Sequence, residues 1–379
     1  MSVRRRVGVN LLWLVPGEVG GSEEYTVRLL RAVSRDRPSD VEIVLYVNSS
    51  FPAAHPDLCD EFVVHVAPVS GVSRPQRVLA ESTWLAWRTW RDRCALVHHA
   101  GGTMPVVRTV PGAVTLHDLQ PLSHPERFGP VKRRWLNWIA PRSLRAARVV
   151  VCLAGFTADD AVQRAGVDPT RVRIVPCGVD DPGAAVDAHL RRDVLERLGL
   201  LDRPFVLYPA ITYPHKNHET LVAAFAVLRA ERPELRLVLT GGESSAEALV
   251  QAAIGAYGVA DDVVRTGRIP EAELDVLYRN ATVMAFPSRY EGFGLPVLEA
   301  MARGCPVVAS DAGALPMVAG DAAVLVDPLE VGAWADALAG ILDDASRRSV
   351  LIRRGFERVR AFTWSDSAAA LVAVYRESR

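Results

Sequence analysis

Lysine is almost absent from this chain of 379 residues, because only Lys132 and Lys216 occur among its 44 basic residues. The 44 acidic residues balance the total charge, and no basic face is concentrated enough to suggest a nucleic-acid partner. The charge is unevenly spread, however: residues 1–180 hold 23 basic and 17 acidic residues, whereas the remainder holds 21 and 27. A basic half joined to an acidic half predicts two domains with different partners.

Cysteine is also scarce. The five cysteines, Cys59, Cys94, Cys152, Cys177 and Cys305, are scattered and show no C-x-x-C spacing. This pattern excludes a disulfide framework and structural zinc, and it favours a reducing, cytoplasmic environment. No H-x-E-x-H or paired D-x-D spacing lies at the end of an expected strand, so we predict no metal ion.

Long hydrophobic runs are missing, since no window approaches the ~20 apolar residues of a membrane span. The N-terminus, Arg4–Arg6 followed by VGVNLLWLV, imitates a secretory signal. Its apolar run is short, however, and PGEVGGSEE follows in place of a cleavage site. We therefore expect a first buried strand there.

Strand-like and helix-like segments alternate along the chain, which predicts an α/β fold with parallel sheets. In the first half we expect strands at Val7–Val15, Val41–Val47, Leu96–His99, Ala113–Leu116, Val149–Leu153 and Val172–Val175. Helices are expected there at Ser22–Val33, Pro75–Arg93, Val131–Ala147 and Thr157–Ala165. A polar stretch, Gly178–Arg192, then separates the two halves.

The alternation resumes after this stretch. The expected strands are Phe205–Pro209, Leu235–Thr240, Val263–Thr266, Val283–Ser288 and Cys305–Ser310. The expected helices are His218–Ala230, Ser245–Tyr257, Val331–Leu342, Arg347–Arg360 and Trp364–Tyr375. We place the domain boundary near residue 180.

The most informative segment is Ser288–Ala300, SRYEGFGLPVLEA. Gly292 and Gly294 allow a positive φ and a close approach of the backbone to a ligand. Pro296 suits the first turn of a helix, and the residues after it favour a helix strongly. The segment thus predicts a loop that leads into a helix whose N-terminus favours phosphate.

Two carboxylates, Glu291 and Glu299, stand eight positions apart on either side of this helix start. A diphosphate bound there would have a hydroxyl-rich group on each side, and each group would face a carboxylate acceptor. That is the chemistry of a nucleotide-sugar. Glutamates around a helix start are also common as partners of the helix dipole, so the spacing alone leaves both interpretations open.

The surrounding sequence decides between them. PSRYEGFGLPVLEAMARGCPVVASDAGALPMVAGDAAVLVDP (Pro287–Pro328) resembles the donor-binding region of family 4 retaining glycosyltransferases, and a looser similarity covers nearly the whole chain. The resemblance implies a GT-B fold, in which two Rossmann-like, doubly wound parallel-sheet domains face each other across a cleft. Residues 1–180, joined by a C-terminal helix at 362–379, would bind the acceptor, and residues 181–361 would bind the donor.

The resemblance also implies roles for the residues of the motif. Glu291 would meet the transferred sugar and Glu299 the ribose hydroxyls. The backbone of four residues would lie against the sugar and diphosphate: Gly292, Phe293, Gly294 and Leu295.

Lys216 lies at the carboxyl end of a strand, in TYPHKNHETL, where its charge suits phosphate and Asn217 could cap the next helix. A solvated lysine is the alternative. In the resembling family a lysine here neutralises the donor diphosphate with an arginine upstream, but this chain has Ile211 in that place. His215, Arg265 and Arg289 are candidates to share the charge.

His117 ends an apolar strand in VTLHDLQ. The resemblance places a histidine–aspartate pair near the transferred sugar, whereas a buried, hydrogen-bonded histidine is the alternative. By the same resemblance, the turn Gly20–Gly21 would close over the donor phosphates. His98 and His99 are either structural or on the acceptor side.

From Arg127 to Arg148 the chain has seven basic residues, no acidic ones, and two tryptophans, Trp135 and Trp138. Such a helix can lie on an anionic membrane, which allows peripheral contact through 127–148 at the inner face. The alternative is a solvated helix whose tryptophans pack inward.

Together these features predict a retaining, metal-independent glycosyltransferase without a cofactor. It would move a mannose- or glucose-type hexose from a UDP- or GDP-linked donor to a glycan, a lipid-linked acceptor or a small molecule. A sugar-nucleotide epimerase of the same shape and a non-catalytic nucleotide-sugar-binding partner are the rival hypotheses.

Overall fold

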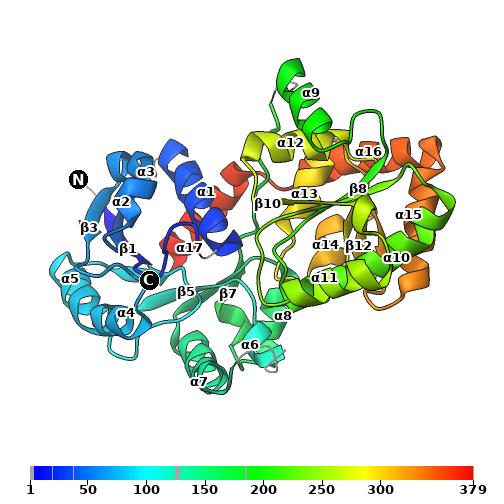
Figure 1. The fold of residues 1–379 in the computed structure, drawn as a ribbon. Helices are drawn as coiled ribbons and strands as arrows, with labels where there is room; N and C mark the ends of the chain where they lie inside the picture. Colours follow the sequence, from blue (N-terminus) through cyan, green and yellow to red (C-terminus); the bar gives the residue numbers. More distant parts are fainter. Residues whose placement is uncertain (1–3, 19, 37, 124–128, 184–185, 379) are drawn as a thin grey trace. The chain divides into compact units, whose positions relative to one another are not determined.

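The computed structural model describes residues 4–18, 20–36, 38–123, 129–183 and 186–378. The chain forms two compact units (Figure 1). The first unit comprises Met1–Gly178 together with Thr363–Arg379, and the second comprises Val179–Phe362. The expected α/β class with two parallel sheets is confirmed.

The first unit is built on a seven-stranded sheet in the order β3-β2-β1-β4-β5-β6-β7, and every neighbouring pair is parallel. The strands are β1 (Arg5–Leu11), β2 (Val41–Val47), β3 (Val63–Val66), β4 (Leu96–His99), β5 (Gly112–Leu116), β6 (Val149–Cys152) and β7 (Val172–Ile174). The strand order reverses between β1 and β4, and ligands of such sheets bind at the carboxyl ends of the strands beside this point. Sequence reasoning missed β3, a short edge strand whose Val63 and Val66 are exposed.

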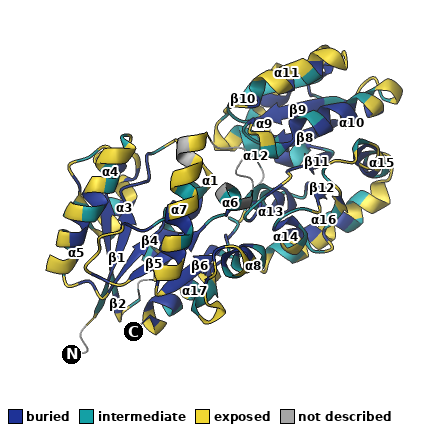
Figure 2. Ribbon diagram, turned by 90° about the horizontal axis from the view of Figure 1, so that it is seen from below, coloured by how far each residue is buried: buried dark blue, intermediate teal, exposed yellow. Residues whose placement is uncertain are grey.

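Helices cover both faces of this sheet. They are α1 (Gly21–Asp36), α2 (Phe51–Ala54), α3 (Pro56–Glu61), α4 (Arg74–Ala80), α5 (Ala86–Arg91), α6 (Gln120–Ser123), α7 (Pro130–Ala146), α8 (Gly155–Gln163) and α17 (Trp364–Glu377). α1 and α17 lie side by side on one face, and α4, α5 and α7 lie on the other (Figure 1). Figure 2 shows the central strands as largely buried and the outer sides of α4, α5 and α7 as exposed.

Two helix predictions in this unit need correction. The helix expected at Pro75–Arg93 is continuous over 74–91, but its middle, Glu81–Leu85, is a π-helical segment between α4 and α5. Ser22 is expected to open the first helix, but α1 begins at Gly21, and the N–H groups of Glu23 and Glu24 donate to the carbonyl of Gly20.

The C-terminal helix α17 is fixed to the sheet through buried polar groups. The hydroxyl of Tyr375 lies 2.7 Å from Nδ1 of His98, and the hydroxyl of Thr115 lies 2.7 Å from the other ring nitrogen, Nε2. Gly178 lies so close to Trp364 that a Cβ there would overlap the backbone of the tryptophan. These contacts make the end of the chain an integral part of the first unit.

The second unit has a six-stranded parallel sheet in the order β10-β9-β8-β11-β12-β13. Its strands are β8 (Phe205–Pro209), β9 (Arg236–Thr240), β10 (Val263–Gly267), β11 (Val283–Phe286), β12 (Val307–Ser310) and β13 (Ala323–Val326). The order reverses between β8 and β11. The loops after these two strands therefore flank the position where a ligand is expected.

The helices of the second unit are α9 (Ala188–Arg197), α10 (His218–Glu231), α11 (Glu247–Ala256), α12 (Glu271–Asn280), α13 (Leu295–Ala302), α14 (Leu315–Ala319), α15 (Val331–Leu342) and α16 (Ala345–Val359). The polar stretch that separates the halves is not irregular throughout, because α9 begins inside it. Asp187 caps this helix by accepting from the N–H groups of His189 and Leu190.

Candidate functional site

Two loops of the second unit meet at the carboxyl ends of β8 and β11. The loop after β8 contains a 3₁₀ turn, Pro214–Lys216, and the loop after β11 carries Glu291. The backbone N–H of Arg289 donates to the carbonyl of His215 at 2.7 Å. The hydroxyl of Tyr208, on β8, donates to the carbonyl of Lys216 at 2.6 Å. The lysine-bearing turn is therefore held against the glutamate-bearing loop.

Lys216 and Glu291 form a direct ion pair. Nζ of the lysine lies 2.7 Å from Oε1 of the glutamate, and the two side chains are only 17% and 13% exposed. The ammonium group also lies 5.1 Å from the centre of the Phe286 ring. Burial alone would raise the pKa of Glu291, but the charges of Lys216 and His215 outweigh it, so this pKa is lowered and the carboxylate is ionised at neutral pH.

Gly313 fixes the backbone of Glu291 from the other side. It has a φ of +63°, and a Cβ at this position would come within 2.7 Å of both the nitrogen and the carbonyl oxygen of Glu291. The next residue, Ala314, donates its N–H to that same carbonyl at 3.0 Å. Glycine is thus required where the two loops touch, and the glutamate has little freedom to shift.

The helix α13 begins next to this pair. Gly294, at its N-cap, has a φ of +96°, and Leu295 is the first helical residue. A Cβ on Gly294 would overlap the side chain of Leu315. Phe293 is buried against Phe362, with ring centres 5.8 Å apart, while Gly292 lies in the loop before it. The expected glycine-rich turn and helix start are both present.

Glu299 lies on α13, and its carboxylate accepts a hydrogen bond from the hydroxyl of Tyr278 at 3.1 Å. Burial, followed by the charge of Glu299, holds the pKa of this tyrosine well above its usual value, so the phenol is a neutral donor. Arg303 donates to the backbone carbonyl of Glu299 and pairs with Asp275. The carboxylate is therefore oriented by α12, a helix that the motif does not include.

Asn217 does not cap α10 as expected. The residue has a φ of +58°, and its side chain makes no capping bond to the helix backbone, although its oxygen accepts from the hydroxyl of Thr220 at 2.9 Å. Its amide nitrogen donates instead to the carbonyls of Pro287 and Pro328, at 3.0 and 2.6 Å, and its oxygen accepts from Nε of Arg289 at 2.9 Å. The buried asparagine thus joins three separate loops around the lysine.

The candidates for the missing arginine differ in their surroundings. Arg265 makes a two-pronged ion pair with Glu247, with both nitrogen–oxygen distances at 2.9 Å. This bonding lowers the pKa of Glu247 to about 2. Arg289 is bound through Nε to the asparagine, and His215 stacks on Tyr213. Arg289 and His215 are in the loops that meet at the site, whereas Arg265 is held by a carboxylate on α11.

His117 lies in the first unit, after β5. Its Nε2 donates to the carbonyl of Ala100 at 2.8 Å, and its ring packs against Trp13 and Tyr25. Burial lowers the pKa of His117 to about 4, although the carbonyl partly opposes this, so the ring is neutral at physiological pH. The carbonyl of Ala100 places the proton on Nε2, and Oδ1 of Asp118 accepts from the N–H of Gln120 at 3.0 Å.

The two preceding histidines, His98 and His99, are buried and hydrogen-bonded within the first unit. His98 is bonded within the first unit, as described above, and Nδ1 of His99 lies 3.2 Å from the amide of Asn10. That amide also donates to the buried carboxylate of Glu81 at 3.1 Å. Burial lowers the pKa of both histidines to about 3, so neither carries a charge.

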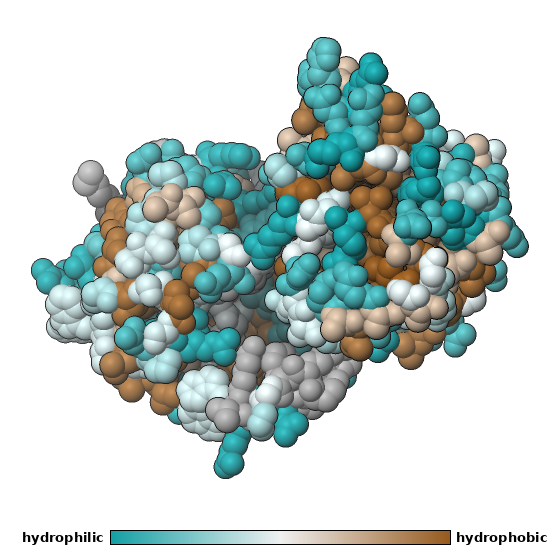
Figure 3. Space-filling model, in the orientation of Figure 1, coloured by the Kyte–Doolittle hydropathy of each residue, from teal (hydrophilic) through white to brown (hydrophobic). Residues whose placement is uncertain are grey.

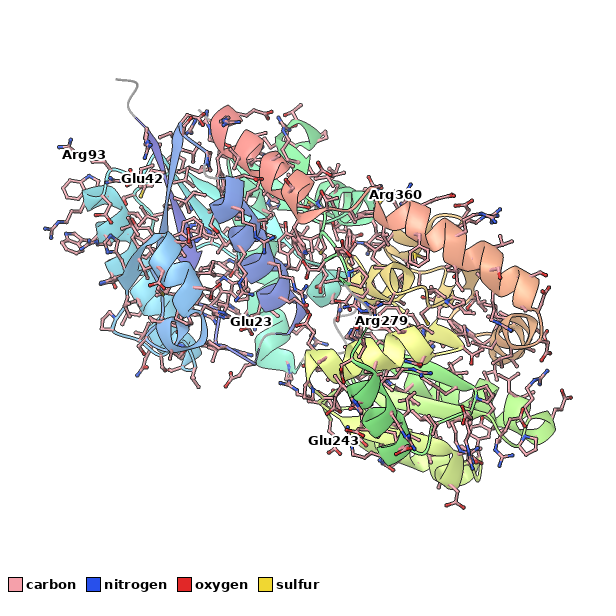
Figure 4. All side chains as sticks on the ribbon, turned by 90° about the horizontal axis from the view of Figure 1, so that it is seen from above. Glu23, Glu42, Arg93, Glu243, Arg279 and Arg360 are labelled. Atoms are coloured by element: carbon pink, nitrogen blue, oxygen red, sulfur yellow. The ribbon has the colours of Figure 1, made fainter. Side chains whose placement is uncertain are left out.

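Gly20 and Gly21 lie at the start of α1, and a Cβ on either would meet no atom within 4 Å. Glu23, labelled in Figure 4, projects from the first turn of this helix. Its carboxylate accepts from the N–H of Gly17 at 2.9 Å and lies 3.3 Å from His55. Glu23 therefore braces the loop that carries the two glycines.

The two tryptophans of α7 do not pack inward. Trp135 and Trp138 are 44% and 49% exposed, and their ring centres are 5.4 Å apart. Arg142 lies over the Trp138 ring. The visible surface over α7 in Figure 3 is pale to teal. This helix exposes aromatic and basic groups together.

None of the helices in the described ranges combines the length and apolar character of a membrane span. Within the same ranges, no three side chains of histidine, cysteine, aspartate or glutamate gather as a metal site would require.

Three contributors to this site were missed from the sequence: Tyr278, Gly313 and the side-chain contacts of Arg289. Tyr278 is 21 positions from Glu299, and Gly313 is 22 positions from Glu291. No local spacing links such positions. The loop glycine in DAGALP, inside the segment that resembles the family, was the one available signal.

Comparisons with known proteins agree with this geometry. Residues 19–181 match the profile of Glycosyltransferase Family 4, and residues 193–358 match that of Glycosyl transferases group 1. The D-inositol 3-phosphate glycosyltransferase of Xylanimonas cellulosilytica is 32% identical over 96% of this chain and 93% of its own length. The O-antigen chain mannosyltransferase B of Escherichia coli is 25% identical over 94% and 96%.

Among solved structures, Anabaena HepE in complex with UDP and glucose has a TM-score of 0.76 and 18% identity, covering 98% of this chain and 99% of its own. The structural likeness establishes the fold, and the sequence relatives establish the family. The chain is a glycosyltransferase of family 4 with the GT-B fold.

Proposed function

We propose that this protein is a retaining glycosyltransferase that transfers a hexose from a nucleoside-diphosphate sugar to an acceptor hydroxyl. The observation that carries the proposal is the assembly of Lys216, Glu291, Glu299 and the start of α13 beside the strand reversal of the second unit. A cation, a helix N-terminus and two carboxylates are the groups that a diphosphate with a sugar at each end requires.

Each group has a role in the transition state. The sugar becomes positively charged while the departing diphosphate gains negative charge. Lys216 and the first turn of α13 stabilise the diphosphate, and a preorganised donor of this kind contributes roughly 3–4 kcal/mol. Glu291 holds the sugar hydroxyls, and Glu299, oriented by Tyr278, holds the ribose.

A dedicated general base is not needed in this mechanism. When the acceptor attacks from the face that the diphosphate leaves, the departing phosphate oxygen takes the acceptor proton. The new glycosidic bond then forms as the bond between sugar and phosphate breaks, with retention of configuration. Because Lys216 and α13 neutralise the leaving group, we propose that transfer proceeds without a metal ion or a cofactor.

The donor is proposed to be UDP- or GDP-linked, with glucose or mannose as the sugar. The complex of HepE with UDP and glucose supports a UDP-linked glucose donor. The mannosyltransferase relative supports mannose as the sugar. We assign the acceptor, a glycan, a lipid-linked acceptor or a small molecule, to the first unit, where the neutral His117 would position the sugar and Gly20–Gly21 would approach the donor phosphates.

We further propose that α7 allows peripheral contact with an anionic membrane from the cytoplasmic side. Its exposed Trp135 and Trp138 and its arginines suit the headgroup region, where aromatic rings and cations both bind. Vesicle flotation tests this: the protein should float with vesicles rich in phosphatidylglycerol and not with neutral ones. A Trp135→Ser/Trp138→Ser variant that floats equally well would contradict it.

The experiment that tests the enzymatic proposal is a thermal-shift panel with UDP, GDP, ADP and TDP, followed by incubation with the matching labelled sugar donor. A ligand that binds the folded protein raises its melting temperature by mass action. We expect one nucleotide to stabilise the protein and its sugar donor to be transferred or slowly hydrolysed. Isomerisation of the donor would instead indicate an epimerase, and binding alone a non-catalytic partner.

A further inference from the structure

The direct contact between Lys216 and Glu291 bears on how the product leaves. We propose that, once the sugar has been transferred, the carboxylate of Glu291 competes with the nucleoside diphosphate for Lys216 and so promotes its release. This inference rests on the proposed function, which assigns the lysine to the diphosphate and the glutamate to the sugar.

The pair is strong enough to compete with a ligand. The two charged atoms are 2.7 Å apart, and both side chains are largely shielded from solvent, so water and salt screen their attraction weakly. The lowered pKa of Glu291 keeps its carboxylate charged at neutral pH. A diphosphate that approaches Lys216 must therefore displace or share a carboxylate that already occupies it.

The intact donor and the product differ in the contacts that they can make with Glu291 once the ion pair is broken. A nucleotide-sugar brings hydroxyl groups that donate to the displaced carboxylate, so the lost ion pair is replaced by charge-assisted hydrogen bonds. The nucleoside diphosphate has lost the hydroxyls of the transferred sugar, and its terminal phosphate places a second negative charge beside Glu291. The pair thus favours the donor over the product of the same reaction.

The structure keeps the pair ready to re-form. Gly313 and Ala314 hold the backbone of Glu291, so the carboxylate cannot follow the departing sugar far. The bond between the N–H of Arg289 and the carbonyl of His215 ties the lysine-bearing turn to the same loop. Loss of the sugar therefore leaves the carboxylate within reach of the lysine.

The test compares Glu291→Gln with the wild type by isothermal titration of UDP, GDP and their glucose and mannose donors. We expect the variant to bind the nucleoside diphosphate at least about tenfold more tightly. Its affinity for the sugar donor should not rise, so its preference for donor over product shrinks. If Glu291 only supported the fold, its replacement would weaken the binding of both ligands together.

Asp262→Asn is the matched control. Asp262 is buried and paired with Arg229 and Arg236, at 2.7 and 3.1 Å, but it lies at the amino ends of β9 and β10, opposite the site. This variant should bind both ligands as the wild type does. If Glu291→Gln does not fold, Glu291→Ala removes the same charge and permits the same comparison.

Two experimental outcomes distinguish failure of this inference from failure of the proposed function on which it rests. If Lys216→Ala binds the nucleoside diphosphate as tightly as the wild type, the assignment of the site itself is wrong. If Lys216→Ala weakens binding but Glu291→Gln does not strengthen it, the site stands and the release role is overturned.

Discussion

Gly313→Ala should damage both the stability and the activity of the protein, because this glycine touches the backbone that carries Glu291. The φ of +63° alone makes alanine unfavourable by about 1 kcal/mol. The added Cβ would also meet two backbone atoms of Glu291 at 2.7 Å, and an overlap of this kind costs about 1–3 kcal/mol further. We therefore expect a total loss of about 2–4 kcal/mol.

Gly258→Ala separates the cost of the positive φ from the cost of the steric overlap. Gly258 has nearly the same φ, +66°, but a Cβ there meets nothing within 4 Å, so this variant should lose only about 1 kcal/mol and retain full activity. Urea denaturation measures the stabilities, and turnover is measured at 15 °C or below, where both variants remain folded by circular dichroism. We expect kcat/KM of Gly313→Ala to fall at least about tenfold, since Glu291 moves. Equal stability and equal turnover of the two variants would refute the reasoning.

Three further predictions follow from contacts elsewhere. Tyr278→Phe removes the hydrogen bond that orients Glu299, so nucleotide affinity should weaken roughly three- to tenfold by titration, and unchanged affinity would separate this tyrosine from the ribose site. Glu247→Gln should lower the free energy of unfolding at pH 7. Because the pKa of Glu247 is lowered to about 2, the stabilisation from Arg265 is complete above the unfolded pKa of about 4.5 and is lost as the pH falls towards 2, where wild type and variant should be equally stable. A stability difference that does not change with pH would argue against the ion pair. Tyr375→Phe should cost about 1 kcal/mol without changing nucleotide affinity, whereas a change in affinity would mean that α17 does more than complete the first unit.

The parts of the fold that follow from local chemistry were predictable. The strand at Phe205–Pro209 and the helix at Val331–Leu342 match the expected bounds, because apolar runs and helix periodicity identify them directly. The turn before α13 was predictable because Gly294 must take a positive φ and Pro296 suits the first helical turn.

Other features depend on contacts between distant residues. The π-helical segment at Glu81–Leu85 lies within a sequence of ordinary helical pattern, and its buried Glu81 accepts a hydrogen bond from Asn10 on β1. Asn217 is a residue type typical of a helix cap, but its side chain bonds to two other loops and to the hydroxyl of Thr220 and makes no capping bond to the helix backbone. Local propensity could not anticipate either outcome.

The same distinction applies to the candidate site. Its residue types could be read from the motif, since a lysine and two glutamates beside a helix start suggest a diphosphate with hydroxyls on both sides. Their mutual arrangement could not. The ion pair between Lys216 and Glu291 joins residues 75 positions apart, and the sequence assigned them to different parts of the ligand.

The central claim is that a diphosphate binds between Lys216 and the start of α13, with one carboxylate towards the sugar and the other towards the ribose. A crystal structure of the protein with the sugar donor that stabilises it tests this most directly. We predict the second phosphate within hydrogen-bonding distance of Lys216 Nζ, the sugar hydroxyls on Glu291 and the ribose on Glu299. A diphosphate bound away from α13, with the Lys216–Glu291 pair still closed, would contradict the account.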